Sequence, residues 1–266
     1  MNILVCIKQV PDTTEIKIDP VTNRLIRDGV PSIVNPFDAD ALEMAARIKD
    51  ARDDVKIVVM SMGPEQAKVA LKTCLAVGGD QAYLVSGRPF GGSDTLATSY
   101  ILASAIKKVE EVEGKFDLIF CGKQAIDGDT AQVGPEIAEH LGYPQITYGL
   151  EGKIEGDEIV IRRETEEGAE ILASKMPCVV TVTKPAFEPR FPKIKDKLAA
   201  NKKEIPVISD QDMEYDATRV GLKGSPTKVK KTFVPQVKTG TEMIEAEDGI
   251  AAAKKLAEVL SGANII

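Results

Sequence analysis

Long apolar runs alternate with amphipathic stretches over the first 145 residues of the chain. Apolar residues fill each run from end to end, which is typical of parallel strands that are buried on both faces. The intervening stretches carry apolar residues three and four positions apart, the spacing of one helix face. The pattern predicts strands at residues 2–10, 55–63, 81–86 and 115–122, and helices at residues 35–51, 64–79, 93–111 and 129–142.

The predicted helix starts carry residues that commonly cap helices. Asn35 stands before Pro36 at the start of the first helix, and Ser93 and Asp94 precede the third. Side chains of these types accept hydrogen bonds from the first free amides of a helix, and proline suits the first turn. We therefore expect Asn35 to cap the first helix and either Ser93 or Asp94 to cap the third.

The pattern changes after residue 145. Residues 147–184 contain strand-like segments separated by the short glycine turns EGDE and EEGA, which is typical of antiparallel hairpins. The run VVTVT then predicts one more buried strand. The sequence as a whole predicts an α/β fold, in which a parallel sheet covered by helices on both faces carries an antiparallel excursion and a C-terminal extension.

The C-terminal part of the chain reverses the sign of the charge. Residues 184–238 carry 13 Lys and Arg against seven Asp and Glu, whereas the whole chain has a net charge of −7. This segment could be a solvated surface loop, but so long a stretch without regular structure is uncommon in a compact domain unless it binds something. The last helix, predicted at residues 242–260, has an apolar stripe and should dock on this chain or on a partner.

Composition narrows the function classes. An acidic chain argues against general nucleic-acid binding. Four cysteines lie far apart without a CxxC pair, which argues against zinc or iron–sulfur sites and indicates buried, free thiols in a reducing compartment. The chain opens on a strand-like run with no basic leader, and no apolar run approaches the ~18 residues of a membrane span. We expect a cytoplasmic protein without a membrane span.

Four loops follow the predicted parallel strands, at residues 8–15, 62–66, 86–95 and 122–132. Ligands of open parallel sheets bind beyond the carboxyl ends of the strands, so these loops should converge. In the last loop Gly128 frees the backbone, and a helix starting near Asp129 or Thr130 would direct unpaired amides and its dipole at an anion. An ordinary Asp-capped helix is the alternative interpretation.

A second candidate is the segment FGGSDTLATS at residues 90–99, where two glycines precede a helix start rich in hydroxyl groups. Its backbone and hydroxyl groups could meet a phosphate or a polar ring, or it could be a capped helix after a flexible turn. No nucleophile–base pair accompanies these loops, and the single histidine, His140, lies in mid-helix. We expect no metal site and no catalytic side chain, and hence a nucleotide-binding protein whose chemistry belongs to a cofactor.

Six motifs resemble, in order, the beta subunit of electron transfer flavoprotein: NILVCIKQVPD, NPFDADALEMA, GKQAIDGDTAQVGP, RRETEEG, PCVVTVTK and EPRFPKIKDKLAANKKEI. The resemblance spans nearly the whole chain. It implies a Rossmann-like sheet of the adenine nucleotide alpha hydrolase-like group in residues 1–205, with a partner-recognition loop at residues 184–203. Residues 206–266 would form an arm and helix that embrace the alpha subunit of a heterodimer.

The resemblance also implies a cofactor site. Residues 122–133 match the motif that binds a phosphate, and FGGSDTLATS resembles the flavin-binding segment of a subgroup that bifurcates electrons. Thr95 and Thr98 would hydrogen-bond the flavin ring, while Ser93 replaces an expected Ala, a change that should matter little. The implied cofactor-binding residues are Cys6, Asn35, Phe37, Asp38, Met62, Asp94, Thr95, Thr98, Gly122, Gln124, Asp127, Gly128, Asp129, Thr130, Ala131, Gln132 and Val133. The implied partner contacts are Glu164, toward the flavin domain of the alpha subunit, and Ile194, the hydrophobic anchor of the recognition loop.

By this resemblance, FAD held in the chain accepts a hydride from NADH. One electron passes to the FAD of the alpha subunit and then to a quinone reductase or an acyl-CoA dehydrogenase, and the other passes to ferredoxin or flavodoxin. One alternative is an ordinary beta subunit that holds AMP as a structural ligand. Another is a stand-alone ATP-binding domain of the universal-stress type, against which the antiparallel excursion and the long basic extension count. The Asp-Thr-x-x-Thr segment favours FAD.

Overall fold

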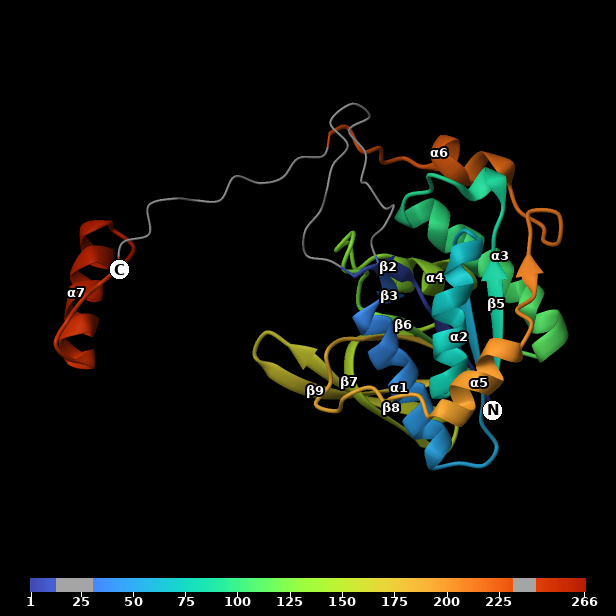
Figure 1. Ribbon diagram of the computed structural model, residues 1–266, viewed down its shortest axis with the longest axis horizontal. Coiled ribbons are helices and arrows are strands. Elements are labelled where there is room, and N and C mark those ends of the chain that lie inside the picture. The colour runs from blue at the N-terminus through green and yellow to red at the C-terminus, as the bar shows by residue number, and fades with distance from the viewer. Residues whose placement is uncertain (13–30, 232–242) are drawn as a thin grey trace. The chain divides into compact units, whose positions relative to one another are not determined.

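A nine-stranded sheet lies at the centre of the larger folded unit (Figure 1). The computed structural model describes residues 1–12, 31–231 and 243–266. The strand order is β11-β5-β4-β1-β6-β10-β7-β8-β9, and the first seven of these strands run parallel. The parallel strands are β1 (Asn2–Cys6), β4 (Lys56–Met62), β5 (Gln81–Val85), β6 (Leu118–Gly122), β7 (Gln145–Glu155), β10 (Cys178–Val182) and β11 (Val207–Ile208).

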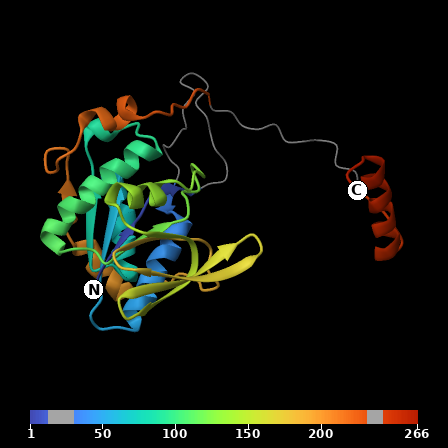
Figure 2. The same cartoon turned by 180° about the vertical axis from the view of Figure 1, so that it is seen from behind.

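Helices cover both faces of this sheet, as the two opposite views show (Figures 1 and 2). On one face α1 (Pro36–Asp50), α2 (Lys68–Val77) and α5 (Ile194–Lys202) share a hydrophobic core with the strands. On the other face α3 (Thr95–Glu113) and α4 (Val133–Leu141) form a second core. Because both faces are covered, β6 and β10 are buried along their whole length. The predicted parallel sheet is confirmed.

The antiparallel excursion is also confirmed. β7 pairs with β8 (Glu158–Thr165), and β8 pairs with β9 (Gly168–Lys175), both antiparallel. The turn between β7 and β8 contains Gly156 at φ 64°, a left-handed conformation that glycine adopts without steric cost.

The first predicted strand is divided in two. β1 ends at Cys6, and the chain then forms β2 (Gln9–Pro11), which pairs antiparallel with β3 (Ser32–Val34) in a separate small sheet. Single turns of 3₁₀ helix complete the connections, η1 (Glu65–Ala67), η2 (Arg88–Phe90) and η3 (Ala217–Arg219), together with the short helix α6 (Gly221–Gly224).

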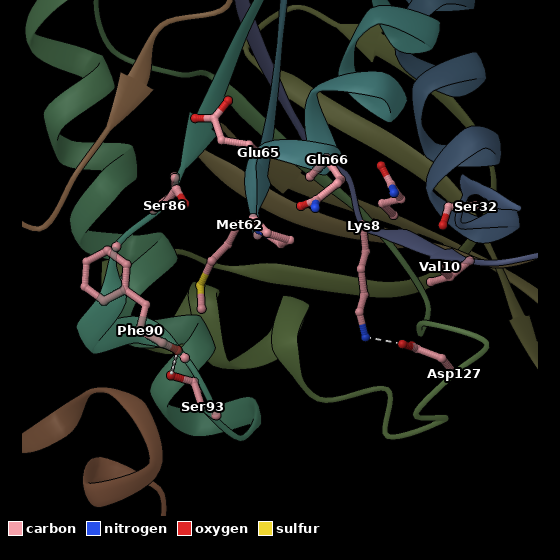
Figure 3. Close-up of a pocket in the computed structure, with 18 of the residues that line it drawn as sticks. Lys8, Val10, Ser32, Met62, Glu65, Gln66, Ser86, Phe90, Ser93 and Asp127 are labelled. Atoms are coloured by element: carbon pink, nitrogen blue, oxygen red, sulfur yellow. Dashed lines mark hydrogen bonds and ion pairs between the residues drawn. The ribbon is translucent and has the colours of Figure 1, made fainter. Parts of the chain in front are cut away.

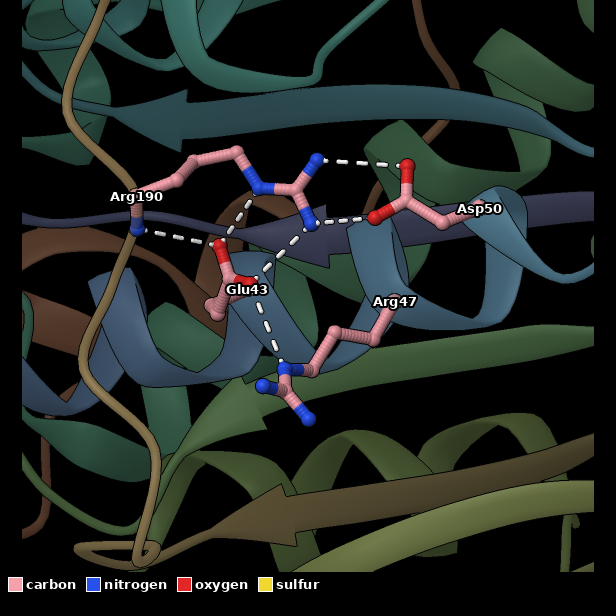
Figure 4. A network of polar contacts seen from close by, with 4 residues as sticks. All are labelled: Glu43, Arg47, Asp50 and Arg190. Carbon is pink, nitrogen blue, oxygen red and sulfur yellow. Dashed lines mark hydrogen bonds and ion pairs between the residues drawn. The ribbon is translucent and has the colours of Figure 1, made fainter.

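The expected recognition loop at residues 184–203 contains an extended segment and then α5, so it is not a loop throughout. Arg190 fixes the extended segment to α1 (Figure 4). Its guanidinium donates to Glu43 at 2.7 and 3.0 Å and to Asp50 at 2.7 Å. These hydrogen bonds hold the pKa of Asp50 below its ordinary value. Arg47 also contacts the Glu43 carboxylate, at 3.4 Å.

The C-terminal region divides later than expected. The described residues form one unit of residues 1–12 and 31–230 and a second of Lys231 and residues 243–266. The expected boundary after residue 205 falls inside the first unit, because β11 pairs with β5. The second unit contains α7 (Gly249–Gly262), which has no buried residue. Residues 13–15 of the first predicted loop and residues 232–242 of the arm lie outside the described residues.

Candidate functional site

The order of the parallel strands reverses between β1 and β6. From β1, the chain adds β4 and β5 on one side, and then returns to place β6 on the other. At such a point the connections diverge and leave a crevice beyond the carboxyl ends of the strands, where open α/β sheets bind ligands. Here those ends are Cys6 and Gly122.

A cavity of about 990 Å³ opens at these strand ends (Figure 3). Its volume is at the upper end of the range of small-molecule sites. Segments that follow β1, β4 and β5 form the wall together with one residue of the loop after β6, so the predicted convergence of the four loops is confirmed for their described residues. The lining residues come from residues 8–11, Ser32, residues 62–67, residues 85–88 and 90–93, and Asp127.

Asp38 joins the ends of β1 and β6. Its Oδ2 accepts from the amide of Lys8 at 2.7 Å, and its Oδ1 accepts from the amide of Gly122 at 3.1 Å. A Cβ at Gly122 would stand 2.3 Å from that oxygen, so this strand end admits only glycine. Burial raises the pKa of Asp38 to about 7, although both amides act in the opposite direction. Both carboxylate oxygens therefore bind backbone amides of the protein. Asp38 holds the ends of β1 and β6 in place and has no oxygen left over for a ligand.

Asn35 ties the loop after β6 to the start of α1. Its Nδ2 donates to the carbonyl oxygen of Gln124 at 2.8 Å, and its Oδ1 accepts from the amide of Ile126 at 3.1 Å. The side chain makes no capping hydrogen bond, so the expectation that Asn35 caps the first helix is wrong. The side chain is fully buried, and its partners are about 90 residues further along the chain.

The loop at residues 122–132 ends later than predicted. Helix α4 begins at Val133 and not near Asp129 or Thr130, because Asp129 and Ala131 adopt φ of 50° and 53°, which a right-handed helix cannot include. The amides of Thr130, Ala131, Gln132 and Val133 donate to no acceptor within the described part of the chain. Successive amides with left-handed residues among them form a concave anion-binding arrangement, and the start of α4 adds its dipole.

The carboxylates of this loop are engaged elsewhere. Asp127 Oδ1 accepts from Lys8 Nζ at 2.6 Å across the cavity mouth (Figure 3), and Asp129 Oδ1 accepts from Gln124 Nε2 at 2.7 Å. Two aspartates whose charge would repel an anion are thus paired or hydrogen-bonded within the protein. The free amides are left as the anion-binding groups of the loop.

The start of α3 faces this loop. Thr95 Oγ1 lies 3.2 Å from Gln132 Oε1 and 3.3 Å from Glu136 Oε1. Asp94, and not Ser93, caps the helix, because its Oδ1 accepts from the amide of Ala97 at 3.0 Å. The two loops singled out in the sequence are therefore neighbours, although the Asp94 carboxylate is committed to the protein.

Of the remaining predicted residues, the cofactor-binding candidates lie at or near the cavity, and the partner-contact candidates lie away from it. Met62 lines the cavity, Phe37 packs against Gly122, and Cys6 lies in register with Cys121. Thr98 is half-buried on α3 and donates its amide to Asp94 O. The two partner-contact candidates do not line the cavity: Glu164 accepts from Thr183 Oγ1 at 3.3 Å on β8, and Ile194, 82% exposed, begins α5.

The four cysteines are free and buried, as expected. The hydrogen bond between the thiols of Cys6 and Cys121, reinforced by burial, raises the pKa of Cys121. This thiol therefore stays protonated near neutral pH and behaves as a small apolar group.

Sequence reasoning missed most polar side chains of the cavity wall, among them Lys8, Gln9, Glu65 and Arg88. Gln9 Oε1 is buried and has no hydrogen-bond partner among the described residues, and Arg88 forms no ion pair with any of them. A signal for the first two was present, since they follow β1 directly. Arg88 precedes the segment FGGSDTLATS, and nothing in the sequence marks it as a ligand contact.

These features fit a nucleotide. Consecutive free amides suit a phosphate, Arg88 supplies a positive charge, and the unpartnered Gln9 oxygen can accept from a ribose hydroxyl or an amine. No cluster of His, Cys, Asp and Glu suited to a metal occurs in the described ranges. Among the helices described, none combines the length and apolarity needed to cross a membrane.

Comparison with known proteins gives a consistent picture. The family model for the electron transfer flavoprotein domain matches residues 22–213. The chain is 54% identical over 250 residues to an electron transfer flavoprotein subunit beta of Megasphaera elsdenii, covering 93% of each chain. It is 49% identical to the subunit of that name in Thermoanaerobacterium thermosaccharolyticum and 46% identical to the caffeyl-CoA reductase–Etf complex subunit CarD of Acetobacterium woodii, covering all of both chains in each case. The chain belongs to the electron transfer flavoprotein family, among its beta subunits, and serves electron transfer.

Proposed function

We propose that this chain is the beta subunit of an electron-bifurcating electron transfer flavoprotein and holds FAD in the cavity beyond β1 and β6. One observation carries the proposal: the loop with the free amides of residues 130–133 lies against the hydroxyl-rich start of α3, with Thr95 Oγ1 3.2 Å from Gln132 Oε1, and both segments closely follow residues of the cavity wall, Asp127 and Ser93. AMP needs only the amide loop. A dinucleotide with a flavin ring would use both loops and the wall at residues 85–93.

Bound FAD would supply hydride acceptance and one-electron transfer, with NADH as the donor. The protein's residues would bind and orient it. The amides of residues 130–133 would hold a phosphate, Arg88 would offset part of the negative charge of the ligand, and the hydroxyl groups of Thr95 and Thr98 would fix the ring. Asp38 would keep the two strand ends in place. No side chain is needed for the chemistry itself.

The partner surfaces lie on other parts of the chain. We propose that α7, whose apolar residues Ile250, Leu256 and Val259 are exposed, grips an alpha subunit. Glu164 would contact the flavin domain of that subunit. Ile194 would anchor an acyl-CoA dehydrogenase or a quinone reductase on a lysine-rich surface, and ferredoxin or flavodoxin would take the other electron. The proposed compartment is the cytoplasm. A relative named as a subunit of a caffeyl-CoA reductase–Etf complex supports such assemblies.

Cofactor extraction tests the assignment. The complex with the alpha subunit should release two FAD per heterodimer, and NADH should bleach the flavin absorbance. One FAD and one AMP would instead identify the ordinary subunit with a structural nucleotide. The stand-alone ATP-binding domain is no longer a candidate, because the chain belongs to the electron transfer flavoprotein family.

A further inference from the structure

A segment from the C-terminal region borders the cavity wall. Residues 207–227, here called the strap, begin at β11, which pairs with β5. Beyond the end of β5, the amide of Ser86 donates to the carbonyl oxygen of Ile208 at 3.0 Å. The strap then packs along the loop at residues 87–95. Residues of this loop also line the cavity. Segments more than 120 residues apart in sequence thus form one structure.

Four hydrogen bonds join the strap to this loop. The amide of Asp94 donates to Ser225 Oγ at 2.8 Å, and Asp94 Oδ2 accepts from both the amide and the hydroxyl of Thr227, at 2.9 and 2.8 Å. The amide of Gly221 donates to Ser93 Oγ at 3.0 Å. Because Asp94 Oδ1 also caps α3, a single carboxylate connects the strap, the loop and the helix that carries Thr95.

Close packing leaves the loop little freedom to move without the strap. The rings of Phe90 and Tyr215 meet edge to face with centroids 5.5 Å apart. Gly221 has φ 65°, and a Cβ there would stand 2.2 Å from the carbonyl oxygen of Pro89. A Cβ at Gly92 would stand 3.3 Å from that of Leu222. The strap and the loop are therefore matched in shape as well as in hydrogen bonds.

We infer that the strap belongs to the cofactor site, with Ser225 and Thr227 as positioning residues that set the loop at residues 87–95 through Ser93 and Asp94. The inference rests on the proposed function and assigns the loop to the flavin end of the ligand. It also revises the expectation for Ser93. An alanine there would leave the Gly221 amide without its acceptor, so the hydroxyl is part of the junction and not a neutral change.

The phosphate loop is linked to this junction indirectly, through Thr95, whose Oγ1 donates to Gln132 Oε1 at 3.2 Å. No hydrogen bond joins residues 122–133 to the strap in the part of the chain that the structure describes. Loosening the strap should therefore lower the affinity for FAD, which would contact the loop at residues 87–95 as well as the phosphate loop. It should leave the affinity for AMP nearly unchanged, because AMP would contact the phosphate loop and not the loop at residues 87–95.

The double variant Ser225→Ala/Thr227→Val in the full-length chain tests the inference, with Thr218→Val as the control. Thr218 lies on the strap, but among the described residues its hydroxyl bonds to Asp216 and not to the loop. The loss of both side-chain hydrogen bonds to Asp94 should weaken FAD binding about tenfold in a titration and leave AMP binding within about twofold of wild type. Amide hydrogen exchange of Asp94 should accelerate in the double variant and not in the control.

Equal affinities of the double variant and wild type for FAD would overturn the inference, and so would equal losses for FAD and AMP. If the wild-type chain binds AMP but not FAD, the proposed function fails by itself. The exchange measurement then tests separately whether the strap positions the loop. Unchanged exchange at Asp94 in the double variant would show that it does not.

Discussion

The buried carboxyl of Asp38 should make stability depend on pH in a direction opposite to that of most acidic side chains. Its ordinary pKa is 3.8, and burial raises the value in the folded chain to about 7. Between these two pH values the folded protein keeps a proton that the unfolded chain has lost. The stability that this group confers is therefore complete below about pH 3.8 and is lost as the pH rises through about 7.

The magnitude follows from linkage. Each pH unit in this window changes the free energy of unfolding by about 1.36 kcal/mol, so the two units from pH 5 to pH 7 correspond to about 2.7 kcal/mol. Asp38→Asn removes the titration and keeps the size of the side chain; its NH2 group loses one of the two amide hydrogen bonds, but that loss does not vary with pH. The difference in unfolding free energy between wild type and this variant should fall by about that amount from pH 5 to pH 8. Asp40, whose pKa burial raises to about 6, is present in both proteins and cancels.

Urea unfolding of the nucleotide-free, full-length chain at half-unit pH steps measures this difference. A carboxyl ¹³C titration of wild type gives an independent value, with an expected midpoint near pH 7. A difference that stays flat from pH 5 to pH 8, with a carboxyl midpoint near 4, would refute the reasoning. It would mean that the amides of Lys8 and Gly122 stabilise the anion enough to cancel the cost of its burial.

Three further changes test the packing and the site. Gly134→Ala should destabilise the chain by ~1–3 kcal/mol in urea unfolding, since a Cβ would stand 2.5 Å from Thr181 Cγ2; an unchanged midpoint would show that α4 can shift freely. Arg190→Met should cost ~1–3 kcal/mol because it strips the buried Glu43 carboxylate of its main donor, and the loss should shrink in a Glu43→Gln background; additive losses would exclude the coupling. Thr95→Val should weaken FAD binding about fivefold at constant Tm, whereas a lowered Tm would make Thr95 a support of the fold.

The buried strands could be predicted because burial on both faces leaves a uniform apolar run, as in the LIF of β6. The cap at Asp94 was also predictable, since its partner is three residues away. The start of α4 was not. Asp-Gly-Asp-Thr resembles a helix-capping sequence, and nothing in it signals that an alanine, Ala131, will adopt a left-handed conformation.

Contacts between residues far apart in the sequence are the second feature that could not be predicted. Asn35 stands where a capping residue belongs, yet its side chain bonds to a loop 89 residues away. Arg190 lies in a basic stretch whose pattern suggests a solvated surface, and only the fold brings it to Glu43, 147 residues earlier. β11 has two residues, too few for any periodicity. Local patterns predicted the elements and the loops that meet, whereas the contacts that hold those loops depend on the tertiary structure.

The single histidine of the chain, His140, can serve as an NMR probe of the C-terminal segment that packs near it. His140 meets the ring of Tyr100 edge to face, with centroids 5.7 Å apart. Tyr100 in turn accepts from the amide of Asp216 at 2.8 Å and lies 3.9 Å under the guanidinium of Arg219. Burial, with the charge of Arg219, lowers the pKa of His140. The NMR signals of its two carbon-bound ring protons should be observable without isotope labelling, because no other histidine contributes to that region. Their chemical shifts and titration midpoint should change if residues 216–219 move away from Tyr100.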